Sequence, residues 1–129
     1  QAEVRLVERG TSLDSVDERP QSITGTLATA AVIHTLYKVP QGWWALVTHY
    51  GFLNTSGATD RDVTVYIRKP GDSAGTEVIK VRLTFAFAAG NDITSDNERW
   101  ILTEGQSIEA QQAVGTDVKY HLSILERKL

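Results

Sequence analysis

Apolar and polar residues alternate with a period of two along most of this chain, in segments that are separated by turn residues. The longest alternating run covers residues 79–88, and a shorter one covers residues 62–68. Because successive side chains of a strand point to opposite faces, such alternation predicts β-strands with one buried face. The segment KPGDSAGT at residues 69–76 lies between the two runs and contains Pro and Gly, which favour turns. The two runs are therefore predicted to form a hairpin.

The same pattern predicts about six strands in all. A strand over residues 32–39 ends at Pro40, which has no N–H to give to a sheet. The next strand covers residues 43–54, with one face formed by Trp44, Leu46, Thr48, Tyr50 and Phe52. Two later strands are predicted at residues 98–103 and 118–125, and residues 107–113 are predicted to continue as a further extended segment. The segment SIEAQQAV at residues 107–114 is the one serious candidate for a short helix.

The first thirty residues give a weaker signal. Residues 2–9 fit a strand or a short helix, residues 11–22 are polar and predict a loop, and Gly25 interrupts a β-branched stretch. We therefore assign residues 1–30 to an N-terminal arm or irregular segment and residues 31–129 to the folded domain. Strands at regular spacing without long helical periods predict an all-β, antiparallel β-sandwich, with a jelly roll as the expected form.

Composition excludes several classes of function. The chain of 129 residues has the length of one domain, and it contains no cysteine, so disulfides, thiolate nucleophiles and cysteine-ligated metals are excluded. Its 13 Lys and Arg and 16 Asp and Glu give a net charge of -3 without a basic cluster, so no nucleic-acid partner is expected. No apolar run approaches the roughly 20 residues of a membrane helix. We expect a soluble chain with no membrane partner.

The reactive side chains form no known catalytic or metal-binding motif. The three histidines, His34, His49 and His121, lie in separate predicted strands without the short spacing of metal motifs. No serine stands in a G-x-S-x-G setting. We therefore predict no metal site, no cofactor and no enzymatic activity.

Two pairs of carboxylates keep a rival prediction open. Glu104 with Glu109, or Asp60 with Asp62, could act as acid and base in glycoside hydrolysis, although acids are also common in solvated turns. The acidic loop at residues 54–62 could offer oxygens to calcium and contains an N-glycosylation sequon, but it lacks the spacing of an EF-hand. We interpret this loop as an ordinary strand connection.

The aromatic residues give the most informative signal. Trp43 and Trp44 are consecutive in a predicted strand, so one of them must point away from whatever the other packs against. An outward tryptophan can stack on a sugar ring, anchor an interface with another chain, or be covered by the N-terminal segment. We favour the interface, with Trp43, Trp44 and Tyr66 as its candidate residues. A carbohydrate-binding module that uses Trp43 or Trp44, with or without Tyr66, as a stacking platform is the alternative.

The order of these segments resembles that of small β-sandwich structural proteins of tailed-bacteriophage virions. The resemblance covers about residues 32–126 and consists of strand-and-turn patterns: "Y-x-V-P-x-G", an "N" before "V-x-V-Y-I", "L-x-x-G-x-S-I" and a final "S-x-x-E". The matching residues are Tyr37, Val39, Pro40, Gly42, Asn54, Val63, Val65, Tyr66, Ile67, Leu102, Gly105, Ser107, Ile108, Ser123 and Glu126.

The resemblance implies a virion component without catalysis, assembled in the host cytoplasm. It would be a capsid decoration or cement protein, or an accessory subunit at the head–tail junction. The implied partners are other virion proteins, such as major capsid or tail subunits, and further copies of the chain in a homo-oligomer. A receptor-binding tail protein that holds a glycan combines this interpretation with the carbohydrate-binding alternative.

Overall fold

The computed structural model describes residues 17–72, 79–95 and 99–129. Within these residues every regular element is a β-strand. The strands are β1 (Glu18–Leu27), β2 (Ile33–Lys38), β3 (Trp43–Asn54), β4 (Arg61–Arg68), β5 (Ile79–Phe87), β6 (Asp92–Ser95), β7 (Trp100–Leu102), β8 (Ser107–Gln112) and β9 (Val118–Lys128).

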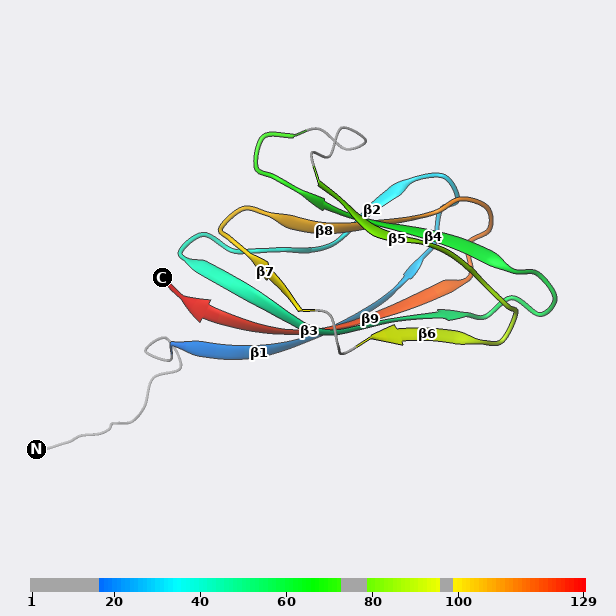
Figure 1. Cartoon of the computed structure of the whole chain (residues 1–129), viewed down its shortest axis with the longest axis horizontal. Helices are drawn as coiled ribbons and strands as arrows, with labels where there is room; N and C mark the ends of the chain where they lie inside the picture. The colour runs from blue at the N-terminus through cyan, green and yellow to red at the C-terminus, as the bar shows by residue number, and fades with distance from the viewer. Residues whose placement is uncertain (1–16, 73–78, 96–98) are drawn as a thin grey trace, which may run out of the picture.

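The strands form two antiparallel sheets that lie face to face (Figure 1). One sheet has the order β1-β9-β3-β6, with β7 also paired to β3, and the other has the order β2-β8-β4-β5. Because β6 and β7 pair with different halves of β3, they share one strand position. Each sheet thus has four positions, and the chain crosses between the sheets repeatedly, as in a jelly roll. The predicted antiparallel β-sandwich is confirmed.

Most predicted strands are present with bounds close to the expected ones. β3 covers the predicted residues 43–54, and β4 pairs with β5 as the predicted hairpin. The ambiguous segment at residues 107–114 contains β8, which is extended and lies between β2 and β4. β6 was not predicted, because four residues carry too little alternation to be recognised.

β1 lies within the first thirty residues, which the sequence assigned to an arm or irregular segment. Residues 18–27 belong to the sheet, because β1 pairs with β9 at all ten positions. Gly25 does not interrupt this strand: a Cβ there would lie 2.4 Å from Tyr120 Oη, so the glycine makes room for the Tyr120 ring. The remaining part of that segment, residues 1–16, lies outside the described residues, and so does the candidate strand or helix at residues 2–9.

The buried core lies between the two sheets and is closed by side chains from both. One face of β3 was predicted from strict alternation, and this prediction is wrong for the first half of the strand. Ala45 and Val47 are buried there, whereas Tyr50 and Phe52 are buried beyond them. The register between β3 and β9 shifts at Thr48, where a β-bulge inserts one residue and reverses the alternation. The other large buried apolar residues are Leu27, Leu36, Tyr37, Val39, Val63, Val65, Ile67, Phe87, Leu102, Ile108, Val118, Leu122 and Ile124.

A buried carboxylate joins the two sheets at one end of the core. Glu126 on β9 is 2% exposed and accepts a hydrogen bond from the Tyr37 hydroxyl on β2 at 2.5 Å. Arg19 Nε on β1 donates to the other carboxylate oxygen at 2.5 Å, and Gln21 Nε2 donates to the same oxygen at 3.3 Å. Burial and the bond to Glu126 raise the pKa of the Tyr37 hydroxyl, so it remains a donor. Both oxygens of the charged group are satisfied, as burial requires.

We predict that Tyr37→Phe destabilises the fold. The substitution removes a donor to a buried carboxylate and should lower the free energy of unfolding by about 1–3 kcal/mol. Chemical denaturation in urea measures this change. Tyr66→Phe is the matched control, because the Tyr66 hydroxyl lies 3.5 Å from Gln111 Oε1 on an outer face, and its loss should change stability by less than about 0.5 kcal/mol. Equal losses in the two variants would contradict the assigned role of Glu126.

A second polar cluster connects the other ends of the sheets. Arg61, at the start of β4, donates to both oxygens of Asp117, from Nε at 2.8 Å and from Nη2 at 3.1 Å. Gln112 Nε2 on β8 donates to Asp117 Oδ1 at 2.9 Å. The bonds from Arg61, and secondarily that from Gln112, lower the pKa of Asp117 to about 2, although partial burial opposes them. The carboxylate is therefore charged at all but strongly acidic pH.

We predict that this cluster gives the fold an acid-sensitive part of its stability. A carboxylate whose pKa is lowered on folding stabilises the protein above its unfolded pKa of 3.8, and the contribution is lost as pH falls toward about 2. Asp117→Asn should therefore lower the melting temperature by a few degrees at pH 7 and by almost nothing near pH 2. Melting curves across this pH range test it, with Asp60→Asn in an exposed loop as control. If Asp117→Asn lowered the melting temperature at pH 2 as much as at pH 7, the stabilisation would not come from the charge of Asp117.

Candidate functional site

The three predicted interface residues lie on three different surfaces. Trp43 points toward the core end of the sandwich, where it packs against buried residues and carries the Arg19 guanidinium 3.9 Å above its ring. Trp44, its neighbour in β3, points to the outer face of the five-stranded sheet, 5.5 Å from the Arg127 guanidinium. Tyr66 on β4 alternates with the buried Val65 and Ile67, so it lies on the outer face of the other sheet. The structure does not bring these three residues together.

Trp44 instead adjoins a row of apolar residues that sequence reasoning missed. Leu46 on β3 stands opposite Leu125 on β9 and opposite Ile101 on β7. Leu125 in turn stands opposite Pro20 on β1. Directly opposed residues of a sheet share a face, so these four side chains form one line across four adjacent strands on the outer face. We call Pro20, Leu46, Ile101 and Leu125, together with Trp44, the apolar row.

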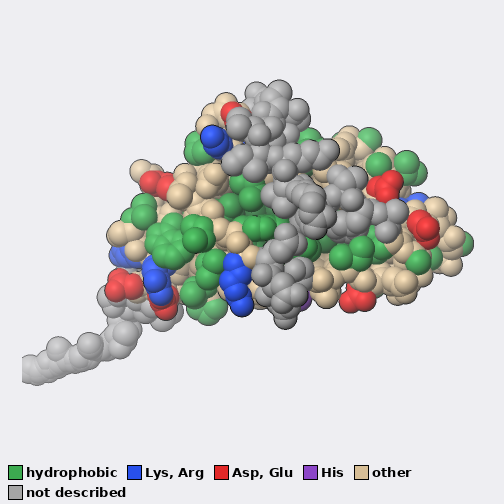
Figure 2. Space-filling view, in the orientation of Figure 1, with side chains coloured by type: hydrophobic (Ala, Val, Ile, Leu, Met, Phe, Trp, Pro, Cys, Tyr) green, Lys and Arg blue, Asp and Glu red, His purple; other side chains and the backbone are tan. Residues whose placement is uncertain are grey.

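The apolar row is partly open to solvent. Leu46, Leu125 and Trp44 are half-buried, whereas Pro20 is exposed and Ile101 is 67% exposed. Charged residues flank the row, because Arg127 stands opposite Trp44 and forms an ion pair with Glu18. Figure 2 shows hydrophobic side chains with basic and acidic side chains beside them at the end of the molecule where β9 finishes. An apolar surface with a charged rim is typical of a contact between proteins.

The sequence does contain a signal for this row. Strands β3, β7 and β9 each have apolar residues at consecutive positions, namely WWALV, WIL and IL. A strand whose two faces are both apolar needs a partner on each face, and only one face of each is covered by the opposite sheet. Consecutive apolar positions in a strand indicate that both of its faces are covered, and on this basis Leu46, Ile101 and Leu125 are predicted to lie on an outward apolar surface.

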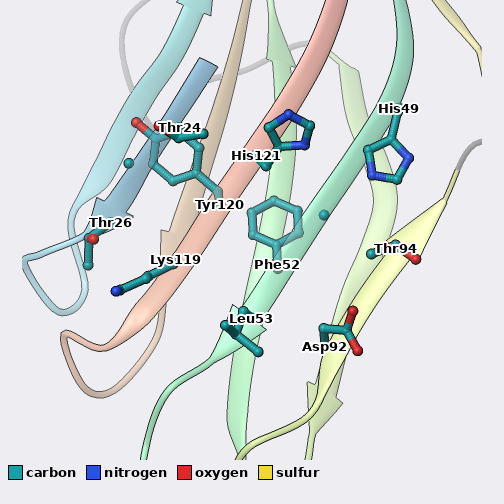
Figure 3. Close-up of a pocket in the computed structure, with 12 residues that line it drawn as sticks. Thr24, Thr26, His49, Phe52, Leu53, Asp92, Thr94, Lys119, Tyr120 and His121 are labelled. Atoms are coloured by element: carbon teal, nitrogen blue, oxygen red, sulfur yellow. The ribbon is translucent and has the colours of Figure 1, made fainter. Parts of the chain in front are cut away.

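The other end of the same outer face is hollowed into a groove of about 480 Å³ (Figure 3). Gly51 on β3 leaves its floor without a side chain, and a Cβ there would lie 3.2 Å from Thr94 Cγ2. His49 from β3 and His121 from β9 lie on one side of the sheet, with their ring centroids 5.6 Å apart. The other polar lining residues are Thr24, Thr26, Asp92, Thr94 and Lys119.

The histidines do not converge on a single point. His34 lies on β2, in the other sheet, where its Nδ1 is 3.0 Å from the Val32 carbonyl oxygen. His121 Nε2 lies 3.4 Å from Ser22 Oγ, so its near neighbours are a hydroxyl and another imidazole. Among the described residues there is no group of three or more His, Asp and Glu side chains arranged to hold a metal ion.

The carboxylate pairs proposed as acid and base have different environments. Glu109 on β8 is 1% exposed and pairs with the Arg68 guanidinium at 2.7 Å, while the Thr35 hydroxyl donates to it at 3.4 Å. Glu104 is exposed in the turn before β8 and accepts a hydrogen bond from the Gly42 amide at 2.9 Å. A carboxylate that is buried against an arginine is not presented to a substrate. Asp60 and Asp62 are exposed at the start of β4.

The loop after β3 has a structural role. Asn54 is fully buried, donates from Nδ2 to the carbonyl oxygens of Thr59 and Phe87, and accepts from the Ser56 amide at 2.9 Å. Its side chain therefore closes the turn and ties it to the end of β5. Because the amide nitrogen of Asn54 is enclosed, the sequon at this position is not presented for glycosylation in the folded chain. The interpretation of the loop as a strand connection agrees with these contacts.

No helix in the described part of the chain is long and apolar enough to cross a membrane.

Comparison with solved structures finds similar chains in viral and bacterial assemblies. A chain in the acid-stable capsid of the Helicobacter pylori bacteriophage KHP30 matches with a TM-score of 0.53 at 15% identity, over 87% of this chain and 88% of that chain. A chain of the Bacillus endospore appendages, which are disulfide-linked pili, matches with a TM-score of 0.47 at 17% identity, over 87% of each chain. A chain in the capsid of cyanophage Pam1 matches with a TM-score of 0.40 at 15% identity, over 93% of this chain and 99% of that chain.

No protein-family model matches the sequence, and no curated protein matches it. At the identities of the structural matches, the likeness concerns the fold. The KHP30 match extends over most of both chains, so it supports the β-sandwich fold.

We predict that the two adjacent tryptophans contribute unequally to stability. Trp43→Ala removes a ring that packs against the core and under Arg19, and should lower the free energy of unfolding by about 2–4 kcal/mol. Trp44→Ala removes a ring from the outer face and should cost about 1 kcal/mol or less. Urea unfolding of both variants measures the difference. A larger loss for Trp44→Ala would show that the outer face, not the inner one, holds this end of the sheet.

Proposed function

We propose that this protein is a non-enzymatic structural component of a bacteriophage virion. In this proposal it is a capsid decoration or cement protein, or an accessory subunit at the head–tail junction, and it acts through contacts with other virion proteins. The observation that carries the proposal is the match of the whole domain to a chain of nearly equal length in the KHP30 capsid. The resemblance of residues 32–126 to small phage structural proteins supports it independently.

The outer face of the five-stranded sheet supports the proposal physically. A decoration protein works by contact area, and it must keep an apolar surface accessible until it meets the capsid. The apolar row fits this need, because it lies across four strands of a rigid sheet and has Arg127 and Glu18 at its rim. Residues on strands present a surface that is already in place before binding, which lowers the entropic cost of association.

The carbohydrate-binding alternative retains Trp44 as its one outward tryptophan. Because Trp43, Trp44 and Tyr66 lie on separate surfaces, no two of them form a common stacking platform. The groove next to Gly51 is a second place where a glycan could bind, because hydroxyl, carboxylate and imidazole groups line it. A receptor-binding tail protein would use this groove, and we treat that function as an outcome of the test below.

We predict that binding to capsids depends on the apolar row. Capsids of the phage that encodes this chain, prepared without it, are mixed with the purified protein, and bound copies are counted after sedimentation. Wild-type protein should bind at saturable, symmetry-related sites, and Ile101→Asp should weaken binding at least ten-fold, because it buries a charge in an apolar contact.

The control is Val114→Asp. Val114 is 69% exposed and Ile101 is 67% exposed, but Val114 lies between β8 and β9, outside the apolar row. It should bind as wild type does, and both variants should melt within about 2 °C of wild type. Failure of the wild-type protein to bind capsids would overturn the decoration proposal. Binding to a glycan array that Asp92→Asn abolishes would favour the receptor-binding tail protein instead.

A further inference from the structure

The sandwich has four edge positions, and they differ in how well they could pair with another strand. On the four-stranded sheet, β2 contains a register shift between Thr35 and Tyr37, and the pairing of β5 with β4 shifts between Thr64 and Tyr66. Bulges of this kind disrupt a ladder and discourage pairing with another chain. On the five-stranded sheet, one edge is divided between β6 with four residues and β7 with three. None of these three edges offers a long regular ladder.

The fourth edge, β1, is long and regular. It pairs with β9 at ten consecutive positions without a register shift. In the described part of the chain β9 is its one partner strand, so the backbone groups on its far side form no ladder. An edge strand of this length that has no bulge is a template for another strand.

The sequence of β1 defines the segment that is able to pair. Pro20 has no N–H, which fits an edge position and limits the ladder at one end. From Gln21 to Leu27 the strand QSITGTL contains no charge and no proline. Charges and prolines are the residues that natural proteins place on edge strands to prevent pairing, and this segment of seven residues lacks both. Its central residue is Thr24.

We infer that a second copy of this chain pairs with β1 in antiparallel orientation, about a twofold axis at Thr24. In this register Thr24 faces Thr24 of the second copy, and Ser22 faces Thr26, so hydroxyl-bearing side chains meet across the junction. A twofold contact needs a surface that is complementary to itself, and an uncharged segment satisfies this because no like charges are opposed. Glu18 and Arg19 would extend past the paired segment and face the uncharged Ala30 and Thr29.

Pairing at β1 would deepen the proposed function. The two five-stranded sheets would become one continuous sheet, in the order β6-β3-β9-β1-β1-β9-β3-β6. Because opposed residues share a face, the outer faces of both copies would lie on the same side, and two apolar rows would face a common partner. The pairing itself rests on the geometry of β1, whereas this use of the double surface rests on the proposed virion function. Two linked contacts bind more tightly than one, through their effective concentration.

A single introduced thiol tests the register, because the natural chain has no cysteine. In Thr24→Cys the two thiols would meet at the twofold axis, where opposed Cα atoms of antiparallel strands lie about 4.5–5.5 Å apart, within the reach of a disulfide. Ser22→Cys is the matched control on the same strand. Its two copies would be four residues out of register, about 13 Å apart, which is too far for a disulfide.

We predict that Thr24→Cys forms a disulfide-linked dimer at least ten-fold faster than Ser22→Cys under mild oxidation, as seen on non-reducing gels. A mixture of Ser22→Cys and Thr26→Cys proteins should cross-link between the two variants in preference to either alone. Light scattering of the wild-type protein should give twice the chain mass of 14.2 kDa. Circular dichroism of the reduced variants verifies that each is folded.

Two results would overturn the inference: a wild-type protein that remains monomeric at about 100 µM, or equal cross-linking rates for Thr24→Cys and Ser22→Cys. The outcome is separable from that of the capsid experiment. A dimer that ignores capsids would retain this pairing and refute the decoration proposal. A monomer that binds capsids would do the reverse.

Discussion

One inserted residue, Thr48, decides which side chains of the central strand lie inside the sandwich. β3 has one residue more than β9 at this point, and the Thr48 hydroxyl donates to the Ser123 carbonyl oxygen at 3.2 Å. Before the bulge, odd-numbered residues face the core; after it, even-numbered residues do. In an uninterrupted strand, Trp44 and Leu46 would lie on the same face as Tyr50 and Phe52. The bulge turns the first pair outward and keeps the second pair inside.

Both features of the outer face depend on this reversal. The apolar row exists because Leu46 stands beside Leu125 and Ile101 instead of in the core. The groove exists because Gly51 and His49 are outside, where the missing side chain of Gly51 leaves the backbone bare. Without the bulge, Leu46 and Gly51 would point to opposite faces of β3, so the apolar row and the groove could not share the outer face.

The sequence predicted the architecture well because strict alternation is a local property. β4 could be located because its apolar residues alternate strictly, and β3 could be located because turn residues flank a long apolar segment. The bulge could not be located, because β3 has apolar residues at both parities around Thr48, and either phase fits the pattern. β1 was not assigned to a strand because its glycine was read as an interruption, whereas the ring of Tyr120, ninety-five positions later, needs that space. Long-range packing of this kind has no local signature.

The sequence predicted an outward tryptophan but not the surface around it. The sequence indicated that one of two adjacent tryptophans must point outward, and Trp44 does so. It also grouped Tyr66 with them, whereas the topology separates it from them, because β3 and β4 belong to different sheets. The burial of polar residues such as Glu126 and Asn54 could not be predicted either, because each has a hydrogen-bond partner that is distant in the sequence.

The position of the buried polar groups explains how a small sandwich keeps its outer face available for contacts. Glu126 ties β9 to both β1 and β2, and Asp117 ties the other end of the sandwich through Arg61 and Gln112. At each end of the sandwich, charge-assisted hydrogen bonds between strands of the domain therefore hold the strands together. The fold therefore does not depend on the apolar row, whose residues lie outside the core. A surface that the fold does not require is free to be used in assembly, and a rigid sheet beneath it keeps that surface in one shape.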